Sequence, residues 1–343
     1  MIKPNVIYDF DGAKEKYRLF CESQNNDIQI FAQPWFLDAA CDASDDWRVI
    51  VYEENGKVTA AFPFQYHHVK GKGWCIDNPF QVARLGLWLN YGNREAAGKR
   101  ETFENQIVQY VIDRLPPYDT FDIKFDARFT NWQQFYRNGF HQTTRYSYLI
   151  RGNGESLLSR ISSGCRNEIR TAEKSHEVIT IQSIDHYWAL FDKSYKNRKR
   201  ISSYSEQRFK RLAEAVLSHH SGQMYLCQSR DTKEPSAISF VFFDKQRCYN
   251  MFNTFFESSS RSTQPLCTYQ SIYDALAMER IFDFEGSMIP GVARYNNQKF
   301  NAVQEPYYHI TKQSYPIILK QSLHEALRAL YHLIKERKGT CGK

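Results

Sequence analysis

The chain has 343 residues, of which 42% are hydrophobic, so it is long enough for two domains of ordinary size that each bury a core. Its formal net charge of +7 is too low for a dedicated nucleic-acid-binding protein, and no DNA partner is expected, but it allows an anionic substrate such as a nucleotide sugar, a coenzyme A ester or a tRNA. The eight cysteines are scattered without a C-x-x-C pair, as in reduced cytosolic proteins, and no stretch reaches the roughly 20 apolar residues of a membrane span. We therefore expect a soluble, cytoplasmic protein.

The first half of the chain alternates helical and extended patterns. In chain order we predict a helix at 33–40, strands at 47–52 and 58–64, a helix at about 100–114 and a strand at 121–125. Asn55 and Gly56 lie between the first two strands, and an Asn-Gly pair between two apolar runs strongly indicates a tight hairpin.

The second half repeats this order. We predict a helix from about 187, strands at 223–227, 237–243 and 248–253, a helix at 265–279 and a strand at 281–285. Thr263 is a candidate N-cap for the last helix, with Pro265 in its first turn. Helices alternating with strands, present twice, indicate an α/β protein with a mixed sheet in each half.

Two segments about 160 residues apart resemble each other. Residues 121–150 and 282–310 both follow the order of strand, polar loop, aromatic-rich turn and strand. A repeat of that length indicates two copies of one domain, which we assign to 1–152 and 153–343, with the boundary in the glycine-containing loop 151–154. A cleft between two such copies is a favoured place for a substrate.

A basic helix is predicted between the two copies, at 156–174. Arg166, Arg170 and Lys174 follow at intervals of four residues and therefore share one helical face. Arginine side chains there suit the oxygens of a phosphate or diphosphate. The alternative is a solvated face in which Glu168 and Glu173 balance these cations.

The stretch 317–338 is also predicted to be an amphipathic helix. Its apolar side carries residues such as Leu319, Leu323 and Leu327. Such a stripe could lie on a membrane surface, but packing against one of the two domains is its commoner use, and we expect packing.

Three segments together resemble the Fem-type transferases that build peptidoglycan cross-bridges in bacteria, and the related FemAB-like and CelD/BioF2-like acyltransferases. These segments are 47–51 with 58–63, the R-N-E-I-R-T-A-E-K helix at 166–174, and 282–287 leading to Lys299 and Phe300. The resemblance covers roughly residues 30 to 312. It implies two tandem GNAT-like domains and direct transfer of an acyl or aminoacyl group to an amine, without a covalent enzyme intermediate.

The donor differs within these relatives. Fem enzymes use an aminoacyl-tRNA and a peptidoglycan precursor, whereas other GNAT enzymes use an acyl-coenzyme A. The glycine-rich loop with which GNAT enzymes bind the coenzyme A pyrophosphate is replaced here by 258–265, which has no glycine, although Arg261 and the helix start would suit a phosphate. The Phe-Lys pair of the Fem enzymes falls near Tyr295, with its lysine absent or displaced to Lys299, and both residues are candidates for binding phosphate.

Two acidic residues are the candidate catalytic groups. Asp283 and Glu285 alternate along the strand predicted at 281–285, so both would lie on one face, where a carboxylate could deprotonate the acceptor amine. Asp77 is a weaker candidate for the same role. No metal is expected, because the paired histidines are adjacent in sequence and adjacent residues do not share a face.

The sequence therefore predicts an acyltransferase that forms an amide on an amine of a small-molecule or lipid-linked cell-envelope or polysaccharide precursor. A first alternative is an acyl-coenzyme A-dependent N-acetyltransferase acting on another small-molecule amine. A second is a catalytically silent tandem GNAT scaffold, which the missing glycines of 258–265 favour.

Overall fold

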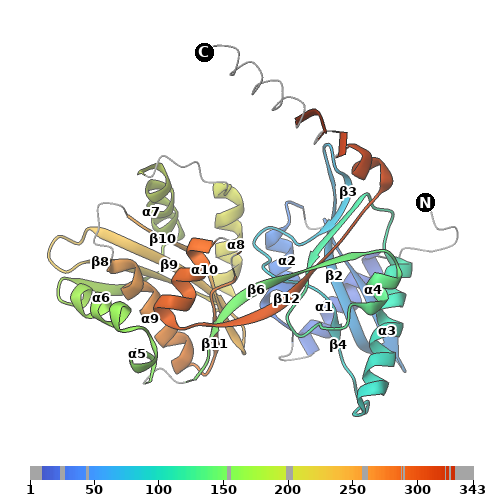
Figure 1. The fold of residues 1–343 in the computed structure, drawn as a ribbon, viewed down its shortest axis with the longest axis horizontal. Helices are drawn as coiled ribbons and strands as arrows, with labels where there is room; N and C mark the ends of the chain where they lie inside the picture. Colours follow the sequence, from blue (N-terminus) through green and yellow to red (C-terminus); the bar gives the residue numbers. More distant parts are fainter. Residues whose placement is uncertain are drawn as a thin grey trace, which may run out of the picture.

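The computed structural model describes residues 10–23, 28–43, 46–152, 156–197, 204–256, 262–286, 288, 290–320, 322–323 and 326–328. Within these residues twelve strands form one continuous mixed sheet, with helices on both of its faces (Figure 1). The strand order is β1-β2-β3-β5-β12-β6-β11-β10-β9-β8-β7, with the short β4 paired to β2. No helix in the described ranges is long and apolar enough to cross a membrane.

The first half contains the predicted elements, two further short strands (β3 and β4) and two further helices (α1 and α4). They are α1 (Phe10–Ser23), α2 (Pro34–Ala40), β1 (Trp47–Glu54), β2 (Lys57–Val69), β3 (Gly73–Asp77), β4 (Trp88–Leu89), α3 (Ala97–Arg114), β5 (Thr120–Lys124), α4 (Gln133–Arg137) and β6 (His141–Ile150). Asn55 and Gly56 both adopt positive φ angles, 52° and 73°, as a two-residue turn between β1 and β2 requires.

The second half follows the same order after two additional helices and a strand. Its elements are α5 (Leu157–Arg160), α6 (Ser163–Glu173), β7 (His176–Ile181), α7 (Ile184–Asn197), α8 (Glu206–Ser218), β8 (Gly222–Ser229), β9 (Pro235–Phe243), β10 (Arg247–Phe255), α9 (Thr263–Ala277), β11 (Ile281–Asp283), α10 (Pro290–Arg294), a π-helical turn (Tyr295–Lys299) and β12 (Val303–Gln313). Helix α9 begins at Thr263, and its N-cap position is Ser262, one residue before the predicted cap.

The last strand of each copy pairs across the middle of the sheet. β12 lies between β5 and β6, and β6 lies between β12 and β11 (Figure 1). In this arrangement His309 and Ile310 of β12 pair with Lys124 and Ile123 of β5, while Leu149 of β6 pairs with Asp283 of β11. Each copy therefore obtains one strand from the other, and the two sheets are joined into one.

One face of the sheet carries a core that the halves share. The residues of α1, α2, α7 and α8 that face the sheet belong to a single apolar cluster, in which the ring centroids of Phe36 and Phe242 lie 6.0 Å apart. The opposite face carries two separate clusters, one under α3 and α4 and one under α6 and α9. This shared core and the exchanged strands hold the functional residues at the seam between the copies.

The structure corrects three of the predicted elements. The strand predicted at 281–285 ends at Asp283, because Glu285 and Gly286 both have positive φ angles. The helix predicted at 156–174 is two helices, α5 and α6, separated at Ile161 and Ser162.

The third correction concerns the C-terminal helix. Residues 315–320 are helical, as predicted for this region, but the apolar side chains that were expected to pack are exposed, including Leu319, Leu323 and Leu327. The expectation that this stripe packs against a domain is therefore wrong for the described part of the helix.

Candidate active site

Glu285 lies just beyond the end of β11, in a turn that holds it close to the sheet. The next residue, Gly286, has a φ of +65°, and a Cβ atom there would approach the carbonyl oxygen of Tyr146 to 2.5 Å. Only glycine fits this turn without displacing the backbone of β6. The turn thus fixes the direction in which the Glu285 side chain leaves the strand.

The Glu285 carboxyl has an unusual protonation equilibrium. Burial disfavours its charged form and, with the nearby negative charge of Asp283, raises its pKa from an ordinary value of 4.5 to about 8, against the opposing attraction of Arg84 and Lys124. A carboxyl whose pKa lies near neutrality exchanges a proton readily with an amine, which suits general acid–base chemistry.

The strands separate at the same place. β11 pairs in parallel with only the first three residues of β10, ending at Tyr249 opposite Asp283. β10 continues to Phe255, and β11 does not extend beside Asn250–Asn253. Glu285 therefore lies where the pairing of two parallel strands ends, between the rest of β10 and the middle of β6.

Asp283 is the centre of a buried charge cluster. Its side chain is fully buried, and its carboxylate accepts hydrogen bonds from Arg84, from the Ser147 hydroxyl, from Arg247 Nη1 at 3.1 Å and from the backbone N–H of Glu285 at 2.8 Å. With both oxygens occupied, this carboxylate is well placed to hold Glu285 and the two arginines in position.

The two arginines of this cluster remain charged. Burial disfavours the charged guanidinium of Arg84, but Asp283, with Tyr249 and Asp126, more than offsets burial and raises its pKa above the ordinary value. Burial also disfavours the charged form of Arg247. Its pKa is nevertheless raised, because it donates hydrogen bonds of 2.6 and 3.1 Å to Glu305 and lies beside Asp283. The cluster therefore joins β10, β11 and β12 to the loop that carries Arg84.

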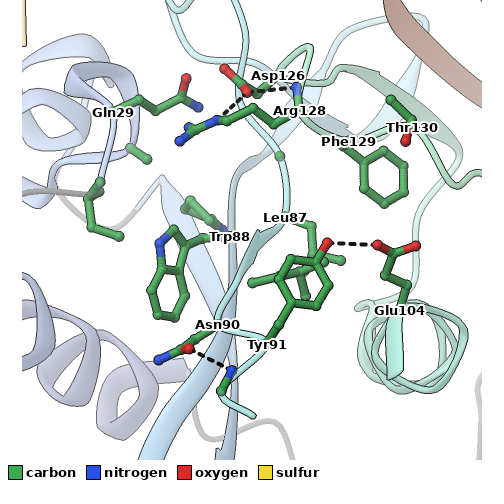
Figure 2. A pocket seen from close by; sticks show the side chains of 16 residues that line it. Gln29, Leu87, Trp88, Asn90, Tyr91, Glu104, Asp126, Arg128, Phe129 and Thr130 are labelled. Carbon is green, nitrogen blue, oxygen red and sulfur yellow. Dashed lines mark hydrogen bonds and ion pairs between the residues drawn. The ribbon is translucent and has the colours of Figure 1, made fainter. Parts of the chain in front are cut away.

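A cavity of about 550 Å³ is lined by residues of the first half (Figure 2). Its walls include the rings of Trp88, Tyr91 and Phe129 and the polar side chains of Asn90, Glu104, Asp126 and Arg128. A volume of this size and a mixed apolar and polar lining are typical of small-molecule sites.

The polar groups of this cavity are held in place by one another. Arg128 Nε donates to Asp126 Oδ1 at 2.7 Å, and the Tyr91 hydroxyl donates to Glu104 Oε1 at 2.7 Å, as the dashed lines in Figure 2 show. Burial raises the pKa of Asp126, but the charge and hydrogen bonds of Arg128 outweigh burial and lower its pKa overall. The cavity therefore presents carboxylates, which attract an ammonium group, beside a guanidinium, which attracts an anion.

Arg84 connects the cavity with Glu285. Its carbonyl oxygen accepts a hydrogen bond from Gln29 Nε2 at 3.3 Å, and Gln29 lines the cavity, as does Gly86 two residues beyond Arg84. The guanidinium of the same residue contacts Asp283 and acts on Glu285. The backbone of Arg84 therefore lies near the cavity, and its side chain belongs to the charge cluster around Asp283 and Glu285.

The residues predicted to bind phosphate do not form one cluster. Arg166 donates through Nη1 to the carbonyl oxygens of Leu158, Ser159 and Ile161 at 2.9–3.2 Å, which joins α5 to α6. Arg170 and Lys174 lie exposed further along the same helix.

The remaining predicted phosphate ligands lie beside α6 or outside the described residues. Lys299 forms an ion pair with Glu168 of α6 and lies 5.9 Å from the centroid of the Tyr295 ring. Burial raises the pKa of Tyr295 well above its ordinary value. Arg261 lies outside the part of the chain that the structure describes. The phosphate-binding role of these residues stays a prediction.

Asp77 is paired with a histidine rather than placed beside Glu285. Its Oδ2 lies 3.0 Å from His67 Nε2, and this hydrogen bond raises the pKa of His67. Among the described residues, no three His, Cys, Asp or Glu side chains gather as a metal site would require.

Sequence reasoning did not find Arg84, Arg247 or the cavity. Arg84 stands within an otherwise apolar run from Val82 to Leu89, and a lone arginine in such a run is the signal that could have indicated a buried ion pair. The cavity has no such signal, because its lining comes from five separate segments of the chain.

Comparison with known proteins agrees with this geometry. Residues 159–295 match the family model of an acetyltransferase (GNAT) domain. FemX shares the fold with a TM-score of 0.62 and 11% identity, over 90% of this chain and 97% of that one. A conserved protein of unknown function from Bacteroides thetaiotaomicron VPI-5482 has a TM-score of 0.55 and 10% identity, over 88% and 97% of the two chains.

L-PGS from Bacillus licheniformis has a TM-score of 0.50 and 12% identity, over 90% of this chain and 96% of that one. The sequence matches none of the curated proteins with which it was compared.

The repeated element order, the GNAT match over residues 159–295 and the likeness to FemX show a GNAT-type fold. Over most of its length this fold is similar to that of FemX, in agreement with the resemblance noted in its motifs.

Proposed function

We propose that this protein transfers an acyl or aminoacyl group to an amine of a cell-envelope or polysaccharide precursor in the cytoplasm. The observation that carries this proposal is Glu285, a carboxyl with a pKa of about 8, placed where the pairing of β10 with β11 ends within the segment that matches a GNAT domain. The overall likeness to FemX supports an envelope precursor as the acceptor.

In the proposed reaction the acceptor amine attacks the carbonyl carbon of the donor. A C–N bond forms, and the C–O bond of an aminoacyl ester or the C–S bond of a thioester breaks. The carboxylate of Glu285 takes the proton that the amine loses, and the leaving oxygen or sulfur takes up a proton from water. Glu285 is then protonated and returns its proton to water before the next turnover.

The first-half cavity is the proposed acceptor site. Its carboxylates, Glu104 and Asp126, suit the positive charge of an amine-bearing precursor, and Arg128 suits an anionic group of the same molecule. The rings of Trp88, Tyr91 and Phe129 offer flat apolar surface for a sugar or a base. The donor would approach from the second half, so that the acceptor amine and the donor carbonyl meet beside Glu285.

Replacing Arg128 by Gln tests the acceptor site. We expect the KM for the acceptor to rise about 10- to 100-fold with little change in kcat, because one charge-assisted hydrogen bond to the bound acceptor is lost. Arg137→Gln is the matched control, since Arg137 is an exposed arginine that donates hydrogen bonds to Gln133 and Gln134 in α4. An unchanged KM in Arg128→Gln would place the acceptor elsewhere.

The acyl-coenzyme A-dependent N-acetyltransferase is the second candidate, favoured by the family match of residues 159–295. An assay with each donor distinguishes the two candidate functions. Purified protein is supplied with acetyl-coenzyme A or with aminoacyl-tRNA, and product formation on amine-bearing envelope precursors is followed. We expect transfer from aminoacyl-tRNA, because the loop 258–265 lacks the glycines of a pyrophosphate-binding loop.

Thermal-shift measurements supply the control. Stabilisation by acetyl-coenzyme A together with acetyl transfer would favour the second candidate instead. Absence of transfer from both donors, with no loss of cellular function in Glu285→Gln, would support the scaffold.

A further inference from the structure

An apolar face projects from the molecule at the end of the described chain. It consists of Tyr315, Ile318, Leu319, Leu323 and Leu327, which we call the C-terminal apolar face. These side chains are 84, 43, 70, 63 and 56% exposed. Their spacing of three and four residues places them on one side of the helix that begins at Tyr315. They make a stripe of exposed apolar surface rather than scattered single residues.

Hydrogen bonds hold the start of this helix to the first half of the chain. Ser314 donates through its backbone N–H to the Asp119 carbonyl at 2.8 Å and through its hydroxyl to Asp119 Oδ1 at 3.1 Å. Lys320 Nζ donates to the carbonyl oxygen of Gly71 at 3.2 Å. Although Lys320 holds the helix to the β2–β3 hairpin, the side chains of Leu319, Leu323 and Leu327 remain exposed.

Cations and an aromatic side chain surround the apolar face. Lys70 and Lys72 lie exposed at the tip of the β2–β3 hairpin, beside which the helix begins (Figure 1), and Trp74 of β3 is 44% exposed. Lys320 and Arg328 belong to the helix itself. In sequence, residues 314–343 contain six Lys or Arg and two Glu. The neighbourhood of the stripe is therefore basic.

We propose that the C-terminal apolar face and its basic rim bind the surface of an anionic lipid bilayer. The apolar side chains would enter the boundary between headgroups and acyl chains, and Lys70, Lys72, Lys320 and Arg328 would meet lipid phosphates. Trp74 has the amphipathic ring that is favoured at this depth.

A second copy of the chain is a poorer occupant of the same face. Self-association through a two-fold axis would bring one basic rim against the other, and like charges at an interface oppose binding. An anionic bilayer satisfies both the apolar stripe and the cations. This proposal holds whether or not the protein transfers an acyl group.

Flotation of the full chain with lipid vesicles tests the proposal. We expect binding to vesicles of phosphatidylcholine with 30% phosphatidylglycerol, and weak binding to pure phosphatidylcholine. The triple variant Leu319→Glu, Leu323→Glu and Leu327→Glu should bind the anionic vesicles at least tenfold more weakly. The pair Lys70→Gln and Lys72→Gln should weaken binding about fivefold for each lysine removed, and more salt should weaken the wild type.

The matched control is the triple variant Leu19→Glu, Tyr136→Glu and Met278→Glu, which adds the same charge at exposed apolar side chains elsewhere. It should keep more of the vesicle binding than the C-terminal triple variant. Equal binding of the two triple variants would overturn the proposal, as would no binding of the wild type to anionic vesicles. Concentration-dependent dimerisation that only the C-terminal variant loses, without vesicle binding, would assign the face to a second copy. Thermal denaturation of each variant checks that it is folded.

Discussion

Replacing Asp283 by Asn is expected to lower the free energy of unfolding by about 3–5 kcal/mol, because two buried arginines lose their shared counter-ion. Asp283 is fully buried. It accepts hydrogen bonds from Arg84, Arg247, Ser147 and the Glu285 backbone. Arg247 would keep Glu305, whereas Arg84 has no other ion pair among the described residues. Urea denaturation monitored by circular dichroism measures the loss.

Asp231→Asn is the control for this experiment, since Asp231 is exposed in the turn between β8 and β9 and should change stability by less than about 0.5 kcal/mol. The double variant Arg84→Met and Asp283→Asn should be less unstable than the two single changes added together, since it removes the orphaned charge along with its partner. If Asp283→Asn unfolds like the wild type but has no activity, Asp283 acts in the chemistry and the structural role assigned here is wrong.

Replacing Glu285 by Gln is expected to lower kcat/KM by about 10²- to 10⁴-fold, the usual contribution of a general base. Gln keeps the size of the side chain but cannot take a proton from the acceptor amine. In the wild type, the rate should rise with pH up to about 8, the pKa of Glu285, and then level off as the carboxylate becomes fully ionised. The pH–rate profile of the transfer reaction should lose this limb in Glu285→Gln.

Glu285→Gln is also expected to raise the free energy of unfolding at high pH. Folding raises the pKa of Glu285 from 4.5 to about 8, so the folded state holds this proton more tightly than the unfolded state. The resulting stabilisation is complete below pH 4.5 and is lost as the pH rises towards 8. Relative to the wild type, Glu285→Gln should therefore gain about 2–4 kcal/mol at pH 9 and nothing at pH 4.

Thermal melting of both proteins across this pH range measures the difference. Glu234→Gln, at an exposed position after β8, should follow the wild type at every pH. A Glu285→Gln variant that retains full activity would remove Glu285 from the mechanism, and a stability difference independent of pH would show that its carboxyl is not perturbed by burial.

Much of the fold follows from local sequence. The strand–turn–strand pattern around Asn55 and Gly56 predicts β1 and β2, and the apolar stripe from Phe103 to Ile112 predicts α3, because both signals depend on residues close together in the chain. The repeat of residues 121–150 at 282–310 correctly predicts that β5 with β6 and β11 with β12 correspond. The family resemblance supplies the GNAT architecture that links them.

The site is harder to predict because it depends on contacts between distant residues. Arg84 and Asp283 are 199 residues apart, and no local pattern pairs them. The prediction that Asp283 and Glu285 share a strand face fails because Gly286 forces a turn against β6, a strand of the other copy. Arg166 looks like a phosphate ligand in sequence, yet its donors are used by the carbonyl groups between α5 and α6, a break that helical periodicity does not show.

The exchanged strands also determine when the molecule can finish folding. Synthesis proceeds from the N-terminus, and domains of a multidomain chain commonly fold as they emerge from the ribosome. Here β5 and β6 emerge long before β12, the strand that lies between them and places Ile310 in the core of the first copy. Until residue 313 has left the ribosome, these two strands expose unpaired edges that could pair with other chains. The first copy is therefore completed only after β12 has emerged, so the two copies become native together.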